Sequence, residues 1–416
     1  MASKANVTFN VLLLSVAIIV GNVIRLKVIP INNEVKRYLG YHEDSYLNFT
    51  EISAKYGYIS EEHTVTTEDG YMLTIFRMRK RSCRQFKRPP VILMHGLLQS
   101  ADVWLDAGPN AGLAYLIADE CHDLWVGNQR GNYYGRRHAR LDPDRDPKFW
   151  KFCVDEIGHY DIPATIDYVL KNTGEKKLNY VGFSQGAGTF LIMCSERPGY
   201  CDKANILIGL APAARQTHTR SVPFRALTEG ISKLEGVLFS TGFHELFYKG
   251  AIEQEFFSFL CKFRATSEAL CNAIIAAIDA FHPGSVGNET LRVLYGHFPA
   301  GTSTHNMARY GQSMQSRKFQ KFDYGKERNL EIYGAEQPAS YNLTAVTVPV
   351  VVLYGRNDRL VDTRDVFWLV KRLPNVLEAS EVADPLWNHL DGTYSQFNKR
   401  LIFPQLNQYL LQYSEV

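Results

Sequence analysis

Short apolar runs recur along the chain and are separated by amphipathic or turn-rich stretches. Each run is about as long as a strand, and most are rich in valine, isoleucine or leucine. Continuous apolar runs of this length, bounded by turn residues, are typical of strands that are buried on both faces. Strands are predicted at residues 90–94, 123–126, 178–182, 205–210 and 348–354, with a last one expected near 376–382.

Helical patterns fall between several of these runs. Residues 161–173 place apolar side chains on one face, with Asp161 as the expected cap, Pro163 in the first turn and Gly174 at the end. A second helix is expected over residues 185–194. The alternation of buried strands with helices predicts an α/β fold with a mostly parallel central sheet.

A long stretch between Pro212 and about Tyr341 breaks this alternation. It is rich in aromatic residues, has helical sequence, and shows no clear buried strand. It is far longer than an ordinary connection of about 2–6 residues, so we interpret it as a mainly helical cap inserted into the α/β domain. The core is then assigned to residues 23–212 and 341–416, and the cap with its lid to residues 213–340.

The N-terminal segment has the pattern of a secretory signal peptide. Lys4 precedes an apolar run over residues 11–20, and the small or polar Gly21 and Asn22 are suitable flanks for a cleavage site. The run is too short to cross a bilayer comfortably, and no later stretch is long and apolar enough for a membrane helix. We therefore expect removal of residues 1–22 and a secreted or lysosomal protein without a transmembrane segment.

Other features fit the secretory route. N-glycosylation sequons begin at Asn48, Asn288 and Asn342. Seven cysteines are present, and because the number is odd, at least one is unpaired or pairs between molecules. None has CxxC spacing and the sequence has no compact His/Cys cluster, so neither a metal nor a cofactor is expected.

The charge balance narrows the class of partner. The chain is 45% hydrophobic and 21% charged with a net charge of +3, which is too weakly basic to indicate a nucleic-acid partner. A local basic run follows a hairpin expected over residues 63–77, and it forms either a nuclear or heparin patch or a solvated hairpin tip. Its members are Arg77, Arg79, Lys80, Arg81, Arg84, Lys87 and Arg88.

A G-x-S-x-G motif occupies residues 182–186, between an expected strand and an expected helix. In that context the motif is typical of a nucleophile elbow, in which flanking glycines let the strand and helix approach closely and the serine hydroxyl projects. A simple strand-to-helix turn is the alternative interpretation. The context favours Ser184 as a nucleophile.

A serine hydroxyl needs a general base, and in this kind of fold the acid and the histidine follow the serine in that order. Asp358 comes just after an expected strand, where a carboxylate can orient an imidazole. Asp362 and Asp365 are its neighbours, but capping the next helix is the simpler role for them. His389 is the only histidine after Asp358, so the order selects it.

Acyl transfer also needs backbone N–H donors for the developing oxyanion. The residue after the nucleophile, Gln185, is expected to supply one donor. The loop over residues 95–97 is expected to supply the other, from Leu97, although His95-Gly96 could also be an ordinary turn.

The surroundings of these residues resemble the acid lipase family, of the lysosomal acid lipase and gastric lipase type. The likeness runs from about Tyr56 to the C-terminus. The matching stretches are residues 95–98 with Trp104, 125–132, 149–150, 155–156, 160–161, 163–167, 299–303 and 388–391.

The resemblance implies an α/β-hydrolase fold with a cap and a movable lid. It also implies hydrolysis of triacylglycerols and, in some members, of cholesteryl esters, at a lipid–water interface. The family positions that carry over are the triad Ser184, Asp358 and His389, the oxyanion donors Leu97 and Gln185, and a cap disulfide between Cys261 and Cys271.

Three departures from the family pattern are visible. Phe183 stands where a histidine is usual, and Arg309 stands where a histidine is common. The cap cysteine pair has one extra residue between its members, and a third cap cysteine is missing. These changes leave the triad intact, but they bear on the pH optimum and on the shape of the acyl pocket.

The sequence therefore predicts a serine ester hydrolase that cleaves fatty-acyl esters through an acyl-enzyme. A non-catalytic lipid-binding or storage protein on the same fold is one alternative, because fold does not fix function. A carboxylesterase for small esters is the other. The intact triad argues against the first alternative, and the large aromatic cap argues against the second.

Overall fold

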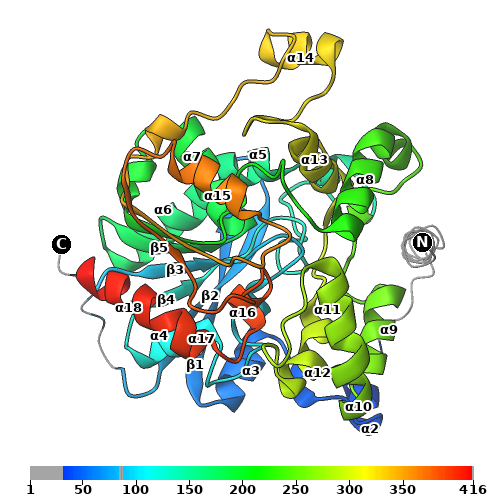
Figure 1. Cartoon of the computed structure of the whole chain (residues 1–416), viewed down its shortest axis with the longest axis vertical. Coiled ribbons are helices and arrows are strands. Elements are labelled where there is room, and N and C mark those ends of the chain that lie inside the picture. The colour runs from blue at the N-terminus through cyan, green and yellow to red at the C-terminus, as the bar shows by residue number, and fades with distance from the viewer. Residues whose placement is uncertain (1–30, 84–85, 87, 415–416) are drawn as a thin grey trace.

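An eight-stranded sheet runs through the computed structural model, which describes residues 31–83, 86 and 88–414 (Figure 1). The strand order is β1-β2-β4-β3-β5-β6-β9-β10. Strands β1 and β2 form an antiparallel hairpin at one edge, β2 is antiparallel to β4, and the remaining pairs are parallel. The strands are β1 (Tyr58–Thr66), β2 (Met72–Lys80), β3 (Val91–Met94), β4 (Leu124–Val126), β5 (Leu178–Phe183), β6 (Ala204–Leu210), β9 (Val350–Tyr354) and β10 (Val376–Glu381).

Helices cover both faces of this sheet because its central strands are apolar on both faces. In β3, Val91 and Leu93 pack into one hydrophobic cluster, whereas Ile92 and Met94 pack into the other. The first cluster includes α3 (Phe49–Lys55), α4 (Leu113–Asp119) and α18 (Phe403–Gln412), and the second includes α6 (Ile162–Thr173), α7 (Gln185–Glu196) and α15 (Thr363–Val370). The predicted α/β fold with a mostly parallel sheet is confirmed.

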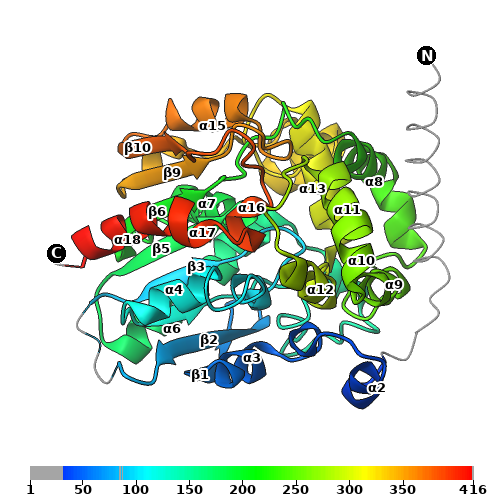
Figure 2. The same cartoon turned by 60° about the horizontal axis from the view of Figure 1, so that its bottom comes forward.

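The chain between β6 and β9 is mostly helical. Helices α8–α13 gather on one side of the sheet, and α14 projects beyond it (Figures 1 and 2). A two-stranded sheet of β7 (Glu245–Leu246) and β8 (Thr302–Ser303) was not anticipated. The helices are α8 (Val222–Ser240), α9 (Ile252–Cys261), α10 (Arg264–Thr266), α11 (Asn272–Ile278), α12 (Asn288–His297), α13 (Thr304–Gln315) and α14 (Lys326–Tyr333). We call residues 213–340 the cap, and its boundaries stay a prediction.

Short elements complete the chain. Near the N-terminal side of the described residues lies α2 (Asn33–Tyr38), and the loop after β10 carries α16 (Asp391–Tyr394) and α17 (Asn398–Leu401). Across the described residues, none of the helices is long and apolar enough to span a bilayer. The expected signal peptide, residues 1–22, lies outside the described residues.

The predicted basic hairpin tip is wrong. The turn of the β1–β2 hairpin is at residues 67–71, whereas the basic run lies at the end of β2 and in the loop toward β3. Arg77 pairs with Asp123 at 2.7 Å, and Lys80 pairs with Asp119 at 3.1 Å. Part of this positive charge is therefore neutralised locally; Arg84 and Lys87 lie outside the described residues.

The predicted cap of α6 is also wrong. Asp161 has helical backbone angles, because helical winding already begins at α5 (Val154–Glu156) and continues through a wide turn at Ile157–Asp161. Its carboxylate instead accepts hydrogen bonds from the Arg130 side chain at 2.7 Å and from the Arg130 backbone N–H at 2.9 Å. Both side chains are almost fully buried, at 1% exposure for Arg130 and 0% for Asp161.

We expect Asp161→Ala to destabilise the fold strongly, because it leaves the Arg130 guanidinium buried with one partner fewer. Breaking a buried pair typically costs about 3–5 kcal/mol in the free energy of unfolding. The control is Asp167→Ala on the same helix, where the carboxylate is 45% exposed and pairs with Lys203. That change should cost less than about 1 kcal/mol. Equal urea-unfolding midpoints for the two variants would contradict the prediction.

Candidate active site

Ser184 lies at the turn from β5 to α7, with backbone angles φ 51° and ψ −115°. A positive φ is unfavourable for a residue with a side chain and persists only where the surrounding structure imposes it. The Ser184 backbone N–H donates to the carbonyl of Leu210 at 2.9 Å, which ties the turn to the end of β6. The geometry is that of a nucleophile elbow.

Crowding around the turn explains its two glycines. A Cβ atom on Gly186 would lie 2.4 Å from the carbonyl oxygen of Met94, at the end of β3. A Cβ atom on Gly182 would lie 2.6 Å from the backbone nitrogen of Ala187. Both separations are shorter than atoms tolerate, so only glycine lets α7 begin this close to the strand ends.

The three predicted triad residues meet at this turn. The Ser184 hydroxyl lies 2.9 Å from His389 Nε2, and His389 Nδ1 lies 2.7 Å from an Asp358 carboxylate oxygen. The other Asp358 oxygen accepts backbone N–H bonds from Leu360 at 2.8 Å and Val361 at 2.7 Å. The arrangement lets the carboxylate fix the imidazole tautomer and lets the free imidazole nitrogen take the serine proton.

All three side chains are buried, and Ser184 is only 5% exposed. Burial lowers the pKa of the His389 imidazole. The charge and hydrogen bond of Asp358 raise it by more, so the pKa of His389 lies above its usual value. The carboxylate stabilises the imidazolium that forms when the histidine accepts a proton. This is the electrostatic requirement for a general base.

Phe183, one of the departures from the family pattern, packs directly against His389. Its ring centroid lies 4.8 Å from that of His389, and it also contacts Trp104. Cβ atoms on Gly96 or Gly392 would lie within 3.1 Å of the Phe183 ring, so the ring fills the space between these loops. An apolar side chain at this position therefore supports the imidazole by packing.

The predicted oxyanion donors flank the same turn. Among the described residues, the backbone N–H groups of Leu97 and Gln185 have no hydrogen-bond acceptor. A Cβ atom on Gly186 would lie 2.7 Å from the His95 carbonyl, so the loop that carries Leu97 lies directly against the start of α7. The two N–H groups are thus available beside Ser184, as an oxyanion hole requires.

His95 holds this loop in place, a role that the sequence did not reveal. Its Nε2 atom accepts from the backbone N–H of Gln129 at 3.2 Å and from the Asn132 side chain at 3.1 Å. Its Nδ1 atom then carries the proton and donates to the Gly96 carbonyl at 2.8 Å. Burial lowers the pKa of His95 to about 4, so the ring stays neutral.

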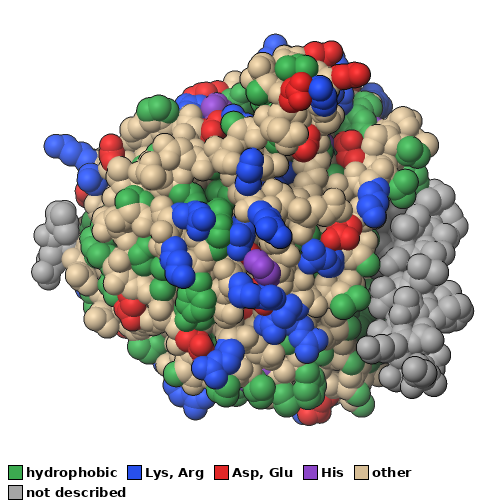
Figure 3. Space-filling view, turned by 45° about the horizontal axis from the view of Figure 1, so that its top comes forward, with side chains coloured by type: hydrophobic (Ala, Val, Ile, Leu, Met, Phe, Trp, Pro, Cys, Tyr) green, Lys and Arg blue, Asp and Glu red, His purple; other side chains and the backbone are tan. Residues whose placement is uncertain are grey.

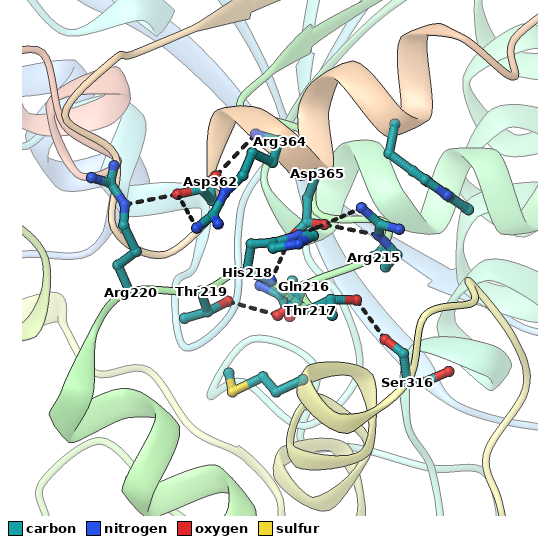
Figure 4. Close-up of polar contacts among 12 residues, drawn as sticks. Arg215, Gln216, Thr217, His218, Thr219, Arg220, Ser316, Asp362, Arg364 and Asp365 are labelled. Atoms are coloured by element: carbon teal, nitrogen blue, oxygen red, sulfur yellow. Dashed lines mark hydrogen bonds and ion pairs between the residues drawn. The ribbon is translucent and has the colours of Figure 1, made fainter.

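Ion pairs support the loop that carries the acid (Figure 4). Asp362 accepts from the backbone N–H of Arg364 at 2.9 Å, so its predicted capping role is confirmed, and it also pairs with Arg220 at 2.7 Å. Arg220 in turn donates to the carbonyl of Asp358 at 2.7 Å.

Asp365 does not cap the helix but pairs with Arg215 and His218 in the same cluster. Lys and Arg side chains gather on this side of the molecule (Figure 3).

Comparison with known proteins gives consistent matches. The sequence family described as a partial alpha/beta-hydrolase lipase region matches residues 49–108, and the alpha/beta hydrolase fold matches residues 89–216. Lipase 1 of Drosophila melanogaster is 39% identical over 369 residues, which are 88% of this chain and 80% of the relative. Gastric triacylglycerol lipase of Homo sapiens is 38% identical over 353 residues, 83% of this chain and 86% of the relative.

The chain belongs to the acid lipase family. It is a lipase with the α/β-hydrolase fold, and its activity is that of a carboxylic ester hydrolase. Residues 49–108, the matched lipase region, contain both the β1–β2 hairpin and the loop with His95 and Leu97.

Three disulfides brace the lipase. They join Cys261 to Cys271 in the cap, Cys194 in α7 to Cys201 just after it, and Cys83 to Cys121. The seventh cysteine, Cys153, is a buried thiol. Each of these bridges restricts the unfolded chain.

We expect Gly186→Ala to impair both the fold and the activity of the lipase. The added methyl group would collide with the Met94 carbonyl, displacing α7 and with it the Gln185 N–H. A displacement of about 1 Å at a reacting group can cost about 100-fold in rate. The control is Gly230→Ala in α8, where a Cβ atom meets nothing within 4 Å. It should keep full esterase activity and gain up to about 1 kcal/mol in stability. Full activity of Gly186→Ala would contradict the packing argument.

Proposed function

We propose that this lipase hydrolyses triacylglycerols and related neutral lipids, with Ser184, His389 and Asp358 as its triad. The continuous hydrogen-bonded line from the Ser184 hydroxyl through His389 to Asp358, at 2.9 Å and 2.7 Å, carries the proposal. The gastric triacylglycerol lipases among its relatives support the choice of substrate.

The reaction runs in two halves. His389 Nε2 accepts the Ser184 proton while the serine oxygen attacks the ester carbonyl, and the Leu97 and Gln185 N–H groups stabilise the resulting oxyanion. The tetrahedral intermediate collapses as the imidazolium gives its proton to the departing alcohol, which leaves an acyl group on Ser184. Water, deprotonated by His389, then attacks the acyl group, and the imidazolium returns its proton to the Ser184 oxygen as the fatty acid is released.

The same proposal covers the localisation and the physical partner of the lipase. The leader pattern and the three sequons support a secreted or lysosomal glycoprotein. Asn48 and Asn342 are exposed, and Asn288 is half-buried at the start of α12. The partner is a lipid–water interface rather than a nucleic acid.

The cap of the lipase carries apolar side chains that face solvent. Within residues 243–281 of the cap, Phe256 and Phe259 are exposed, whereas Leu246, Phe247 and Ile275 are buried. Further exposed apolar residues of the cap are Val222, Leu234, Val237, Ile252, Phe263, Leu270, Phe281, Leu330 and Ile332. We propose that part of residues 243–281 forms a lid over Ser184 that opens at a lipid surface, because exposed apolar side chains favour contact with lipid.

We expect Ser184→Ala to lose nearly all esterase activity while keeping the fold, since removal of a triad nucleophile costs roughly 1,000-fold or more. A serine-reactive phosphonate should label the wild type at Ser184 and not label this variant. Ser240→Ala, at the end of α8, is the matched control and should behave as the wild type. Substantial turnover by folded Ser184→Ala would reject the proposed nucleophile, and a wild type without esterase activity would favour a lipid-binding protein.

We expect the rate on a partly soluble ester to rise sharply once the substrate exceeds its solubility, because droplets open the lid. Phe256→Ser should weaken this rise and leave activity on dissolved ester unchanged. Phe367→Ser on α15 is the control, since Phe367 is 44% exposed but lies outside the cap. Hydrogen exchange in residues 243–281 should quicken when detergent micelles are added. A rate that rises as a simple hyperbola through the solubility limit, with hydrogen exchange in residues 243–281 unchanged by micelles, would instead favour a small-ester carboxylesterase.

A further inference from the structure

The proposed mechanism leaves one buried carboxylate beside the triad without a role. Asp279 belongs to the cap and directly follows α11. Its side chain is fully enclosed, with 0% of the residue exposed. A buried charge of this kind is costly unless polar partners compensate it, so its contacts identify what it holds.

Those contacts reach both catalytic loops. One Asp279 oxygen accepts the backbone N–H of Arg359 at 2.9 Å, and the other accepts the backbone N–H of Leu390 at 3.1 Å. Arg359 is the residue after the proposed acid Asp358, and Leu390 is the residue after the proposed base His389. A single carboxylate from the cap therefore bridges the two loops that must stay aligned for proton transfer.

The neighbouring cap residues strengthen this attachment. The Ala280 carbonyl accepts from the Asn388 side chain at 2.8 Å. His282 and Ser285 contact Asp391 at 2.6 Å and 2.5 Å, on the far side of His389. The segment from residue 279 to residue 285 thus lies along the histidine loop. Within this described segment, Asp279 accepts backbone N–H groups from both loops.

The electrostatic surroundings make this bridge sensitive to protonation. Burial, and then the charge of Asp358, raise the pKa of Asp279 to about 7, while His389 opposes the rise. Other charged or titratable side chains on the packed elements include Arg220, Arg356 and Arg359 on the acid side. In the cap segment, His282 faces Asp384 and Asp391 of the histidine loop. The ionised carboxylate also raises the pKa of His389.

We propose that Asp279 is a positioning residue through which the cap holds the acid and histidine loops in alignment with Ser184. This inference rests on the proposed triad. Because the bridge originates in the cap, a shift of α11 would move the Asp279 carboxylate that contacts both loops. The position of the cap and the alignment of the triad are therefore coupled.

The test is Asp279→Asn, assayed on a water-soluble ester so that lipid binding does not contribute. An asparagine has one acceptor oxygen, so it can satisfy only one of the two backbone N–H groups and turns its own N–H toward the other. We expect kcat to fall by roughly 100-fold, the effect of slight misalignment, with little change in KM.

The pH profile separates this role from a merely structural one. His389 acts as a base only when neutral, and loss of the Asp279 charge lowers the pKa of His389. The acid limb of kcat/KM should therefore move to lower pH in Asp279→Asn. The control is Asp384→Asn, which removes a carboxylate that faces His282 at 3.5 Å and leaves both backbone bridges intact. It should keep the wild-type kcat and acid limb.

The results of these experiments separate the positioning role of Asp279 from the proposed triad. A folded Asp279→Asn with wild-type kcat and acid limb overturns the positioning role, provided that phosphonate still labels Ser184 in the wild type. Absence of that labelling would instead reject the proposed triad. If Asp279→Asn does not fold, hydrogen exchange of the wild type decides: after correction for intrinsic rates, the Arg359 and Leu390 amides should lose protection as pH falls from 8 to 5. Unchanged protection overturns the role.

Discussion

The close approach of α7 to the ends of β3 and β5 is the constraint on which the rest of the site depends. There is no room for a side chain at residue 186, and the chain can enter the helix only if Ser184 adopts a positive φ. That conformation projects the serine hydroxyl away from the sheet and leaves the first N–H of the helix without an internal partner. The proposed nucleophile and one proposed oxyanion donor thus depend on the same packing.

The remaining parts of the site come from other loops at the same edge of the sheet. The loop after β9 brings Asp358, the loop after β10 brings His389, and the loop after β3 brings Leu97. Parallel strands make this convergence possible because their carboxyl ends meet at one edge. Polar contacts from outside support these loops: Arg220 contacts the loop after β9, the cap contacts the loop after β10, and His95 holds the loop after β3.

The sequence was sufficient wherever local pattern and chain order carried the information. Ser184 stands in a motif, and the single histidine after Asp358 left no competitor for His389. The apolar runs likewise predicted the central strands. Asp161 failed as a predicted cap because its true partner, Arg130, lies on a different segment and the helical winding starts earlier than the pattern suggests.

The contacts that sequence reasoning missed connect residues far apart along the chain. Asp279 meets Leu390 across 111 positions, and nothing in either local sequence marks the pair. His95 and Phe183 were noted for their places in motifs, but their packing roles depend on three-dimensional neighbours. The two-residue strands β7 and β8 are too short for any periodicity to appear.

The pairing of β6 with β9 has a consequence for how freely the cap can vary. Leu207 lies opposite Val350 in a parallel pair, so the chain leaves at one end of β6 and must return to the other end before β9 begins. Residues 341–348 make that return, with Tyr341, Leu343, Val346 and Val348 packed into the same hydrophobic cluster as α6 and α7. This return path replaces the crossover helix of an ordinary parallel connection. Insertions upstream of it would leave the sheet undisturbed. A deletion within it would remove buried side chains from this hydrophobic cluster and expose this face of the sheet to water.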